Sequence, residues 1–317
     1  SKYTFRFVSP TGSFADSIYV AASQSLCVVP TSSTPTTPTG IKKTMKRLPD
    51  TGENQGYTST YGEDNDFSLF PNYFSNAGTG ITVDSSTGLM WQKTDGGEMT
   101  YENALIYADT LTLGGYTDWR LPSPRESFSI INHQNVNPAI DQTVFSSTGG
   151  NADYWWTNSR QANDTTKVWC TNAGGGIGNK PKSETISAGG TKRYNVRAVR
   201  DAQTPGTVSV HFVNNGDGTI TDSMTNLMWQ RVPYSDSLTW ENALIYADTL
   251  STGGYIDWRL PNIKELQSIC DESKYTPGVD TVYFKITNNK KYWSSTTIPN
   301  RTTQAWYMNT QYGITSY

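Results

Sequence analysis

Cysteine and histidine are scarce in this sequence of 317 residues, which contains three cysteines and two histidines. Cys27, Cys170 and Cys270 allow at most one internal disulfide, and no CxxC or CxxCH motif gives them metal or haem spacing. His133 and His211 lie at unmatched positions in the two halves of the chain, without a nucleophile and acid set around them. We therefore expect no metal, no cofactor and no catalytic residues, while the state of the three cysteines stays open.

Charge and long apolar runs are also in short supply. Charged residues make up 17% of the chain and the net charge is −3, with no basic run long enough to attract nucleic acid. No apolar stretch approaches the roughly 20 residues that span a bilayer. We expect neither nucleic-acid binding nor membrane insertion. The abundant residues are Ser, Thr, Asn, Gly, Tyr and Trp, a mix common in β-rich extracellular or cell-surface proteins.

A repeat organises the sequence. The string ENALIYADTL occurs at residues 102–111 and again at 241–250, and flanking strings such as GGYxDWRLP recur in the same order. A duplication of this length indicates two tandem domains. The sequence divides into an N-terminal strand segment at 1–29, a Pro/Thr-rich linker at 30–45, a first module with its lead-in at 46–201, and a second module at 207–317.

The repeated string predicts a helix in each module. Thr100 and Thr239 are suited to be its N-caps, and Gly114 and Gly253 are suited to stop it. Apolar residues recur at helical spacing and form the expected buried stripe of the first copy: Ala104, Leu105, Ala108 and Leu111.

A second short helix is predicted after each WRLP string. SPRE at 123–126 and NIKE at 262–265 both have the pattern of a capping box. Elsewhere short alternating runs surround turns, as in HFVNNGDGTITD at 211–222, and predict strands. Two short helices among many short strands indicate an α+β fold with short twisted antiparallel sheets in each module.

Several motifs occur in an order that resembles a known family. GLMWQ at 88–92, DWRLP at 118–122 and RYNVRAVR at 193–200 follow one another as in the C-terminal domain of the Legionella collagen-like adhesin (Lcl_C), common in bacterial surface proteins. The resemblance covers about 78–200 and 216–317. It implies a C-type-lectin-like fold whose first and last strands pair, and a role in adhesion and polysaccharide binding.

The same resemblance argues against an enzyme. Formylglycine-generating enzymes share this fold and carry a similar WRLP string, but their chemistry needs two active-site cysteines that neither module supplies. Charged residues near WRLP fit structural ion pairs, turns and helix caps better than acid–base catalysis: Asp118, Arg120, Glu126, Asp257, Arg259 and Glu265. Glu63, Asp64 and Asp66 form an acidic cluster for which cation binding is a minor alternative.

Aromatic side chains are the candidates for polysaccharide binding, because a sugar ring stacks on a flat aromatic face. Such residues are more often part of a core, and both interpretations stay open for five of them: Trp155, Trp156, Tyr292, Trp293 and Trp306.

The second module contains no counterpart of the last strand of the first. The first module ends with RYNVRAV at 193–199, interpreted as an alternating strand, whereas the sequence after Trp306 reaches Tyr317 without one. KYTFRFV at 2–8 matches the missing string position by position. We therefore predict that this segment fills the vacant strand position of the second module. The strand-donation interface would consist of Tyr3, Phe5, Arg6 and Phe7.

Two functions follow from these patterns. Donation of residues 2–8 to a neighbouring copy would make an extracellular structural protein that assembles head to tail with itself. Closure within one chain would leave an adhesin that binds polysaccharide without polymerising. The length of the Pro/Thr-rich linker is compatible with both.

Overall fold

The computed structural model describes residues 3–5, 18–20, 40–67, 69–147, 153–183, 193–286 and 290–317. The chain forms two compact units, Ser1–Thr39 and Gly40–Tyr317. In the first unit, strand β1 (Tyr3–Phe5) pairs antiparallel with β2 (Ile18–Val20). Arg6, Phe7 and Cys27 lie outside the described residues.

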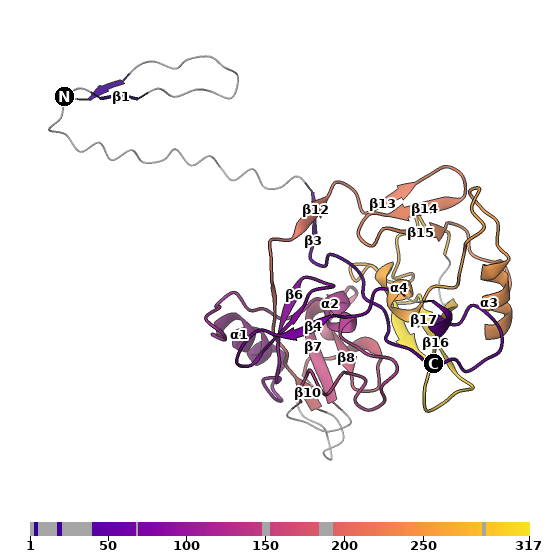
Figure 1. The fold of residues 1–317 in the computed structure, drawn as a ribbon, viewed down its shortest axis with the longest axis horizontal. Coiled ribbons are helices and arrows are strands. Elements are labelled where there is room, and N and C mark those ends of the chain that lie inside the picture. Colours follow the sequence, from indigo (N-terminus) through magenta and orange to yellow (C-terminus); the bar gives the residue numbers. More distant parts are fainter. Residues whose placement is uncertain are drawn as a thin grey trace. The chain divides into compact units, whose positions relative to one another are not determined.

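The first module builds two four-stranded sheets, in the orders β10-β7-β8-β9 and β11-β6-β5-β4, and two helices (Figure 1). All neighbouring strands run antiparallel except β10 and β7, which are parallel. Its elements are η1 (Asp64–Asp66), β4 (Phe74–Asn76), β5 (Ile81–Asp84), β6 (Leu89–Gln92), α1 (Tyr101–Thr110), α2 (Pro124–Ser129), β7 (Asp153–Gln161), β8 (Asp164–Asn172), β9 (Ile177–Pro181), β10 (Arg193–Asn195) and β11 (Val199–Asp201).

The second module repeats this plan with three strands per sheet, in the orders β13-β14-β15 and β16-β17-β18. Its elements are β13 (Phe212–Asn214), β14 (Thr219–Asp222), β15 (Leu227–Gln230), α3 (Trp240–Asp248), α4 (Ile263–Ser268), β16 (Lys291–Thr297), β17 (Ala305–Asn309) and β18 (Ile314–Ser316). β12 (Gly206–Val208) pairs with β3 (Ile41–Lys43). Small, mostly antiparallel sheets with two short helices per module confirm the α+β class.

The helices begin where the sequence predicts. Thr100 accepts a hydrogen bond from the Asn103 amide at 3.1 Å, and both capping boxes are formed in α2 and α4. The predicted stop was wrong, because α1 ends at Thr110 and Gly114 lies in the following turn with φ +62°. A Cβ at Gly114 would meet Ile81 at 2.0 Å, so close packing also requires glycine there.

The buried stripe was predicted correctly except at Leu105, and Leu111 is partly buried against the same cluster as the alanines. Ala104 and Ala108 are buried, whereas Leu105 is 37% exposed. Its counterpart Leu244 is buried, because the loop around Gly62 lies against it. The lead-in of the first module therefore covers the helix of the second.

One hydrophobic core cluster contains residues of both modules of residues 40–317. Helices α2 and α4 lie side by side (Figure 1), and each sends a basic side chain to the other module. Lys264 Nζ donates to the Ser129 carbonyl at 2.8 Å, and Arg125 donates to the Cys270 carbonyl at 3.3 Å. Both bonds satisfy carbonyls at the C-terminal ends of the short helices, so each module supplies a hydrogen-bond donor that caps a helix of the other.

The lead-in adds a buried cluster of carboxyl groups at the same junction. Asp64 accepts hydrogen bonds at 2.7 Å from the hydroxyls of Thr51 and Thr296, and Glu53 accepts from Thr297 of β16. Burial is the main cause that raises the pKa of Glu53 to about 8 and that of Asp64 to about 7. The folded state therefore favours the protonated, uncharged form of both acids.

We therefore predict that the protein loses stability as the pH rises from 6.5 to 8. In this window the folded state retains protons on Glu53 and Asp64 that the unfolded state has released, so the free energy of unfolding falls with pH. The lowered pKa of His133, about 3, affects stability mainly below pH 6.5, and the lowered pKa of Lys264, about 8, affects it mainly above pH 8. We expect a loss of about 2 kcal/mol, measured as a fall in melting temperature of several degrees.

Glu53→Gln removes the largest of these contributions and should flatten the pH dependence between 6.5 and 8. Glu102→Gln is the matched control, because Glu102 is 59% exposed in its ion pair with Lys182. An unchanged slope in Glu53→Gln would contradict the assignment.

Candidate functional site: an open groove in the second module

The segment after β9 closes the first module by joining both of its sheets. β10 places Tyr194 beside Tyr154 of β7, and β11 places Val199 beside Trp91 of β6. The sequence prediction of a single alternating strand was wrong, because these two short strands belong to different sheets. The six consecutive residues that link and partly form these strands are all buried, including two polar ones: Tyr194, Asn195, Val196, Arg197, Ala198 and Val199.

Backbone hydrogen bonds hold this segment along its length. The amides of Met99 and Gln92 donate to the carbonyls of Tyr194 and Ala198 at 3.1 and 2.9 Å. Val199 and Arg120 exchange two bonds of 2.9 Å. The segment therefore satisfies backbone groups that a buried edge would otherwise leave unpaired.

Apolar packing holds the same segment from the other side. Tyr194 stacks on Trp156 with ring centroids 4.6 Å apart and lies 5.3 Å from the ring of Tyr154. Val196 and Ala198 belong to the same buried cluster, beneath helix α1. Buried aromatic pairs of this kind each contribute roughly 0.5–1.5 kcal/mol beyond their area.

Arg197 is the polar centre of the closing segment. Its guanidinium donates to the carbonyls of Gln92 at 2.9 Å, Lys93 at 2.5 Å and Ser146 at 2.9 Å. It also lies 5.0 Å from the ring of Phe145. Asp95 is within 3.6 Å, but burial dominates and lowers the pKa of Arg197 to about 10.

In the described part of the second module, no segment occupies the corresponding place. The four residues of β6 are buried, whereas all four residues of β15, the same string LMWQ, are partly exposed. A cavity of about 1020 Å³ opens at this point. Its walls carry the counterparts of the first module's core, among them Met228, Trp229, Trp258, Leu260, Tyr292 and Trp293.

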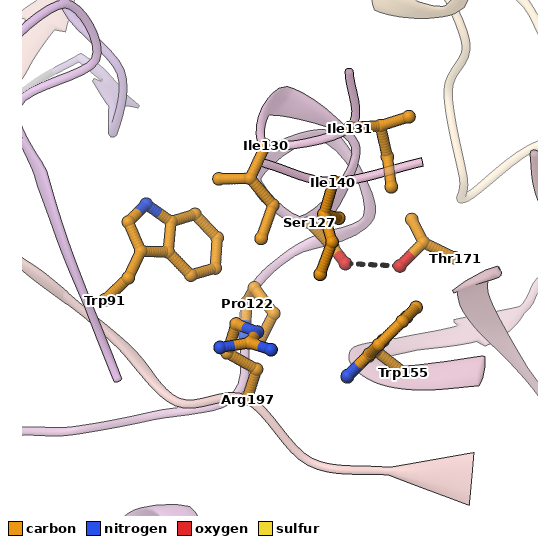
Figure 2. A pocket seen from close by; sticks show the side chains of 9 residues that line it. All are labelled: Trp91, Pro122, Ser127, Ile130, Ile131, Ile140, Trp155, Thr171 and Arg197. Atoms are coloured by element: carbon orange, nitrogen blue, oxygen red, sulfur yellow. Dashed lines mark hydrogen bonds between the residues drawn. The ribbon is translucent and has the colours of Figure 1, made fainter. Parts of the chain in front are cut away.

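The first module shows how little space remains after closure. Figure 2 shows the nine side chains around its small cavity of about 10 Å³, room for roughly one water molecule. Five of these residues correspond to residues that line the open groove: Trp91, Pro122, Ser127, Ile130 and Trp155 correspond to Trp229, Pro261, Leu266, Ile269 and Tyr292.

The groove presents polar groups that the first module uses to bind its closing segment. The Gln92 Nε2 donates a hydrogen bond to the Tyr107 hydroxyl at 2.6 Å, and the Gln92 Oε1 accepts one from the Ala198 amide at 3.2 Å. In the second module the Gln230 Nε2 donates to the Tyr246 hydroxyl at 2.7 Å in the same way. In the described part of the chain no donor reaches the Gln230 Oε1. These glutamines were not among the site residues predicted from the sequence, although both end the repeated LMWQ string.

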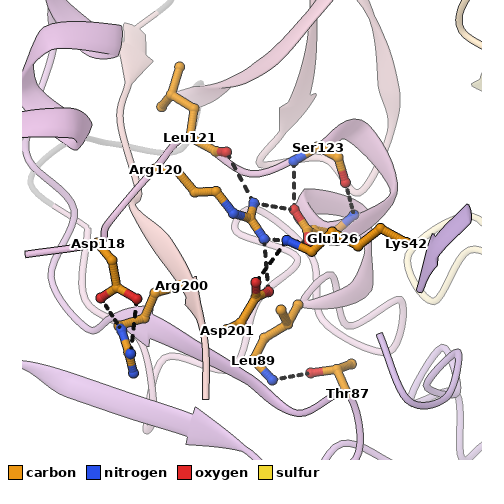
Figure 3. Close-up of polar contacts among 10 residues, drawn as sticks. All are labelled: Lys42, Thr87, Leu89, Asp118, Arg120, Leu121, Ser123, Glu126, Arg200 and Asp201. Atoms are coloured by element: carbon orange, nitrogen blue, oxygen red, sulfur yellow. Dashed lines mark hydrogen bonds and ion pairs between the residues drawn. The ribbon is translucent and has the colours of Figure 1, made fainter. Parts of the chain in front are cut away.

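The charged residues around WRLP form structural contacts, as Figure 3 shows for the first module. Arg120 makes a bidentate pair with Glu126 at 2.7 and 2.8 Å, and Arg120 also contacts Asp201 at 3.2 Å. Glu126 is at the same time the acceptor of the capping box. Arg259 and Glu265 repeat the pair in the second module. Asp118 pairs instead with Arg200 at 2.7 Å.

The acidic cluster is bound by hydrogen-bond donors of the chain. Glu63 accepts from the amides of Tyr57 and Thr58, and Asp66 accepts from the amide of Gly62. Among the described residues, no group of three or more acidic, histidine or cysteine side chains is placed to hold a metal ion.

The five aromatic candidates for polysaccharide binding divide into two sets. Trp155, Trp156 and Trp306 are at most 4% exposed and form part of the cores. Tyr292 and Trp293 line the open groove. A sugar ring needs an open aromatic face, so Tyr292 and Trp293 are the members of the set that the fold leaves able to stack on one.

We predict that equivalent mutations in the closed and the open module lower the free energy of unfolding by different amounts. Trp156→Ala should lower the free energy of unfolding by about 3–5 kcal/mol, because the ring is fully buried and stacks on Tyr194. Trp293→Ala should cost less than half as much in a monomeric chain, because one side of Trp293 borders the groove. Chemical denaturation of both variants provides the comparison. Equal costs would mean that the groove is filled in the monomer.

The comparison with family models matches the Lcl C-terminal domain twice, over residues 80–200 and 218–317. No curated protein and no solved structure matches the chain. None of the helices within the described residues combines the length and apolar character needed to cross a membrane. The two matches cover more than half of the sequence and coincide with the two modules of the fold. The chain therefore belongs to the Lcl C-terminal domain family, a surface-associated bacterial family, and carries two tandem copies of the domain.

Proposed function

We propose that this chain is a non-enzymatic structural subunit of a cell-surface or extracellular filament, displaying C-type-lectin-like modules. Residues 2–8 of one copy insert into the open groove of the second module of another. The observation that supports this most strongly is the groove itself, which lies where the first module holds residues 193–199.

The inserted segment supplies what the groove is missing. By sequence correspondence Tyr3 takes the place of Tyr194 on Trp293, while Phe5 and Phe7 take the places of Val196 and Ala198. Burying each aromatic ring stabilises the complex by roughly 1.5–3 kcal/mol. The amides and carbonyls of the segment pair with the edges of β15 and β16, as β11 and β10 pair with β6 and β7.

Donation between copies gives a head-to-tail polymer. Each chain carries one donor segment and one groove, so the contact is heterologous and repeats without limit unless it closes into a ring. Within the described residues, β1 pairs with β2 over three residues of each strand. A pairing of two such short strands is marginally stable, so exchanging it for the groove costs little.

Polysaccharide binding is the second candidate, and the position of Tyr292 and Trp293 in the groove favours it. An inserted strand would cover both rings. The two functions therefore compete for one surface, and a chain that binds polysaccharide there would do so as a monomer or at the open end of a filament.

Complementary variants separate donation between copies from closure within one chain. Tyr3→Asp with Phe5→Asp disables the donor, and Ala247→Trp fills the groove from helix α3. Each variant alone should be monomeric, whereas the unmodified chain polymerises. An equimolar mixture should form discrete heterodimers, because one intact donor meets one intact groove. Size-exclusion chromatography with light scattering and negative-stain imaging measure all four samples.

Matched controls carry the same substitutions elsewhere. Ile245→Trp places the indole on the exposed face of α3, where Ile245 is 50% exposed, and should polymerise. Ser32→Asp with Thr34→Asp adds the same charge outside residues 2–8 and should also polymerise. Filaments from the donor variant would falsify the proposal. The adhesin would be established instead by two results together. The unmodified chain would be monomeric and bind polysaccharide, and Ala247→Trp would abolish that binding.

A further inference from the structure

We infer that the second module contains a binding seat for a guanidinium group and that Arg6 of the inserted segment occupies it and fixes the register of the strand. The seat consists of the backbone carbonyls of Gln230, Arg231 and Lys285 beside the ring of Phe284. This inference rests on the proposed function, because Arg6 reaches the seat only if residues 2–8 enter the groove.

The seat corresponds group by group to the one that holds Arg197. Gln230, Arg231, Lys285 and Phe284 occupy the positions of Gln92, Lys93, Ser146 and Phe145, and the first four all border the groove. The backbone is bonded alike in both modules: the Lys285 amide donates to the Arg231 carbonyl at 3.0 Å, and the Ser146 amide donates to the Lys93 carbonyl at 3.1 Å.

Two further pairs of bonds fix the shape of the seat. The Arg231 amide donates to Gly218 at 2.9 Å, where Lys93 donates to Gly80 at 2.8 Å. The Phe284 amide donates to Asp280 at 2.9 Å, as in the corresponding turn of the first module. The three carbonyls are therefore held in the arrangement that binds a guanidinium in the first module.

Two arginines that line the groove are engaged by other groups. The Arg231 side chain donates to the Tyr283 carbonyl at 3.2 Å, and Arg259 is committed to Glu265. Among the described residues, no side chain donates to the carbonyls of Gln230, Arg231 or Lys285. A ligand entering the groove thus meets three oriented dipoles whose remaining lone pairs accept donors.

Arginine is the side chain that this geometry selects. Its planar fork presents five donors and reaches several carbonyls at once, whereas lysine offers one compact ammonium group. Asp95, which lies 3.6 Å from Arg197, has Pro233 at its position in the second module. Without that carboxylate, the second seat depends on the fork geometry more than on charge, which makes lysine a poor replacement.

The seat also gives the inserted strand a single register. A displacement by one residue would bring Phe5 or Phe7 to the carbonyls and reverse the faces of the strand. A displacement by two residues would bring Thr4 or Val8 there. Each alternative leaves Arg6 without its acceptors in a desolvated groove. The arginine therefore also excludes the two-residue displacement, which the aromatic residues alone would tolerate.

The test uses full-length chains with Arg6→Gln and Arg6→Lys, and Lys2→Gln as the matched control that removes a charge from the same segment. We expect Arg6→Gln to raise the critical concentration for polymerisation by about 100-fold and Arg6→Lys by at least about 10-fold. Lys2→Gln should change it by less than about threefold. Sedimentation at increasing protein concentration measures each value.

Cross-linking reports the register independently of affinity. In a Cys27→Ser background, Ser9→Cys with Met228→Cys should form an intermolecular disulfide, because Arg200 lies beside Met90 at the corresponding place. Ser9→Cys with Asn226→Cys detects a strand displaced by two residues. The first pair should dominate with Arg6 present, and Arg6→Gln should divide the cross-links between both pairs.

The outcomes separate this inference from the proposed function. Polymers from Arg6→Gln with an unchanged critical concentration and an unchanged cross-link pattern would overturn the arginine seat while leaving strand donation intact. Absence of polymers from the unmodified chain would overturn both.

Discussion

Closure of two sheets by one shared segment is the constraint on which this architecture depends. In the first module, residues 193–201 form the edge strands β10 and β11, supply Tyr194 to the core and send Arg197 into a cage of carbonyls. Remove that segment and two strand edges, a set of aromatic faces and several buried acceptors are uncovered together. The described residues of the second module show that uncovered state, although its helices, turns and ion pairs are those of the first.

The groove remains well shaped because the rest of residues 40–317 is tightly integrated. The second module shares its core with the first, and Lys264 and Arg125 satisfy helix-terminal carbonyls across the junction. The lead-in adds Asp64 and Glu53, which accept hydrogen bonds from Thr296 and Thr297 at the C-terminal end of β16, outside the residues that line the groove. These supports do not involve the missing segment. The acceptor is thus preorganised, and binding a strand would order mainly the strand, which lowers the entropic cost of association.

Sequence patterns predicted the parts of this fold that depend on local interactions. The duplication, the α+β class, the N-caps at Thr100 and Thr239 and both capping boxes follow from side chains that act within one turn of the chain. Patterns failed where long-range packing decides. Residues 193–199 alternate in polarity like a surface strand, yet Arg197 is buried, and its guanidinium donates to three carbonyls from two distant places in the chain, Gln92–Lys93 and Ser146. Leu105 and Leu244 are identical in sequence context and differ in exposure, because the lead-in covers only one of them.

Long-range packing also decided what could be predicted of the candidate site. The match between residues 2–8 and 193–199 could be found from sequence alone and placed Arg6 in the predicted interface, but the alternation put Arg6 opposite Tyr3 and Phe5 without indicating what it contacts. The structure of the first module shows that both faces of the matched segment are enclosed, so a polar residue there needs specific acceptors. Apolar side chains supply most of the binding free energy in such a groove and tolerate displacement along it. A buried guanidinium contributes less net free energy, but it is satisfied in one position only. In one short segment the aromatic residues would therefore provide the affinity, and the arginine would fix the register.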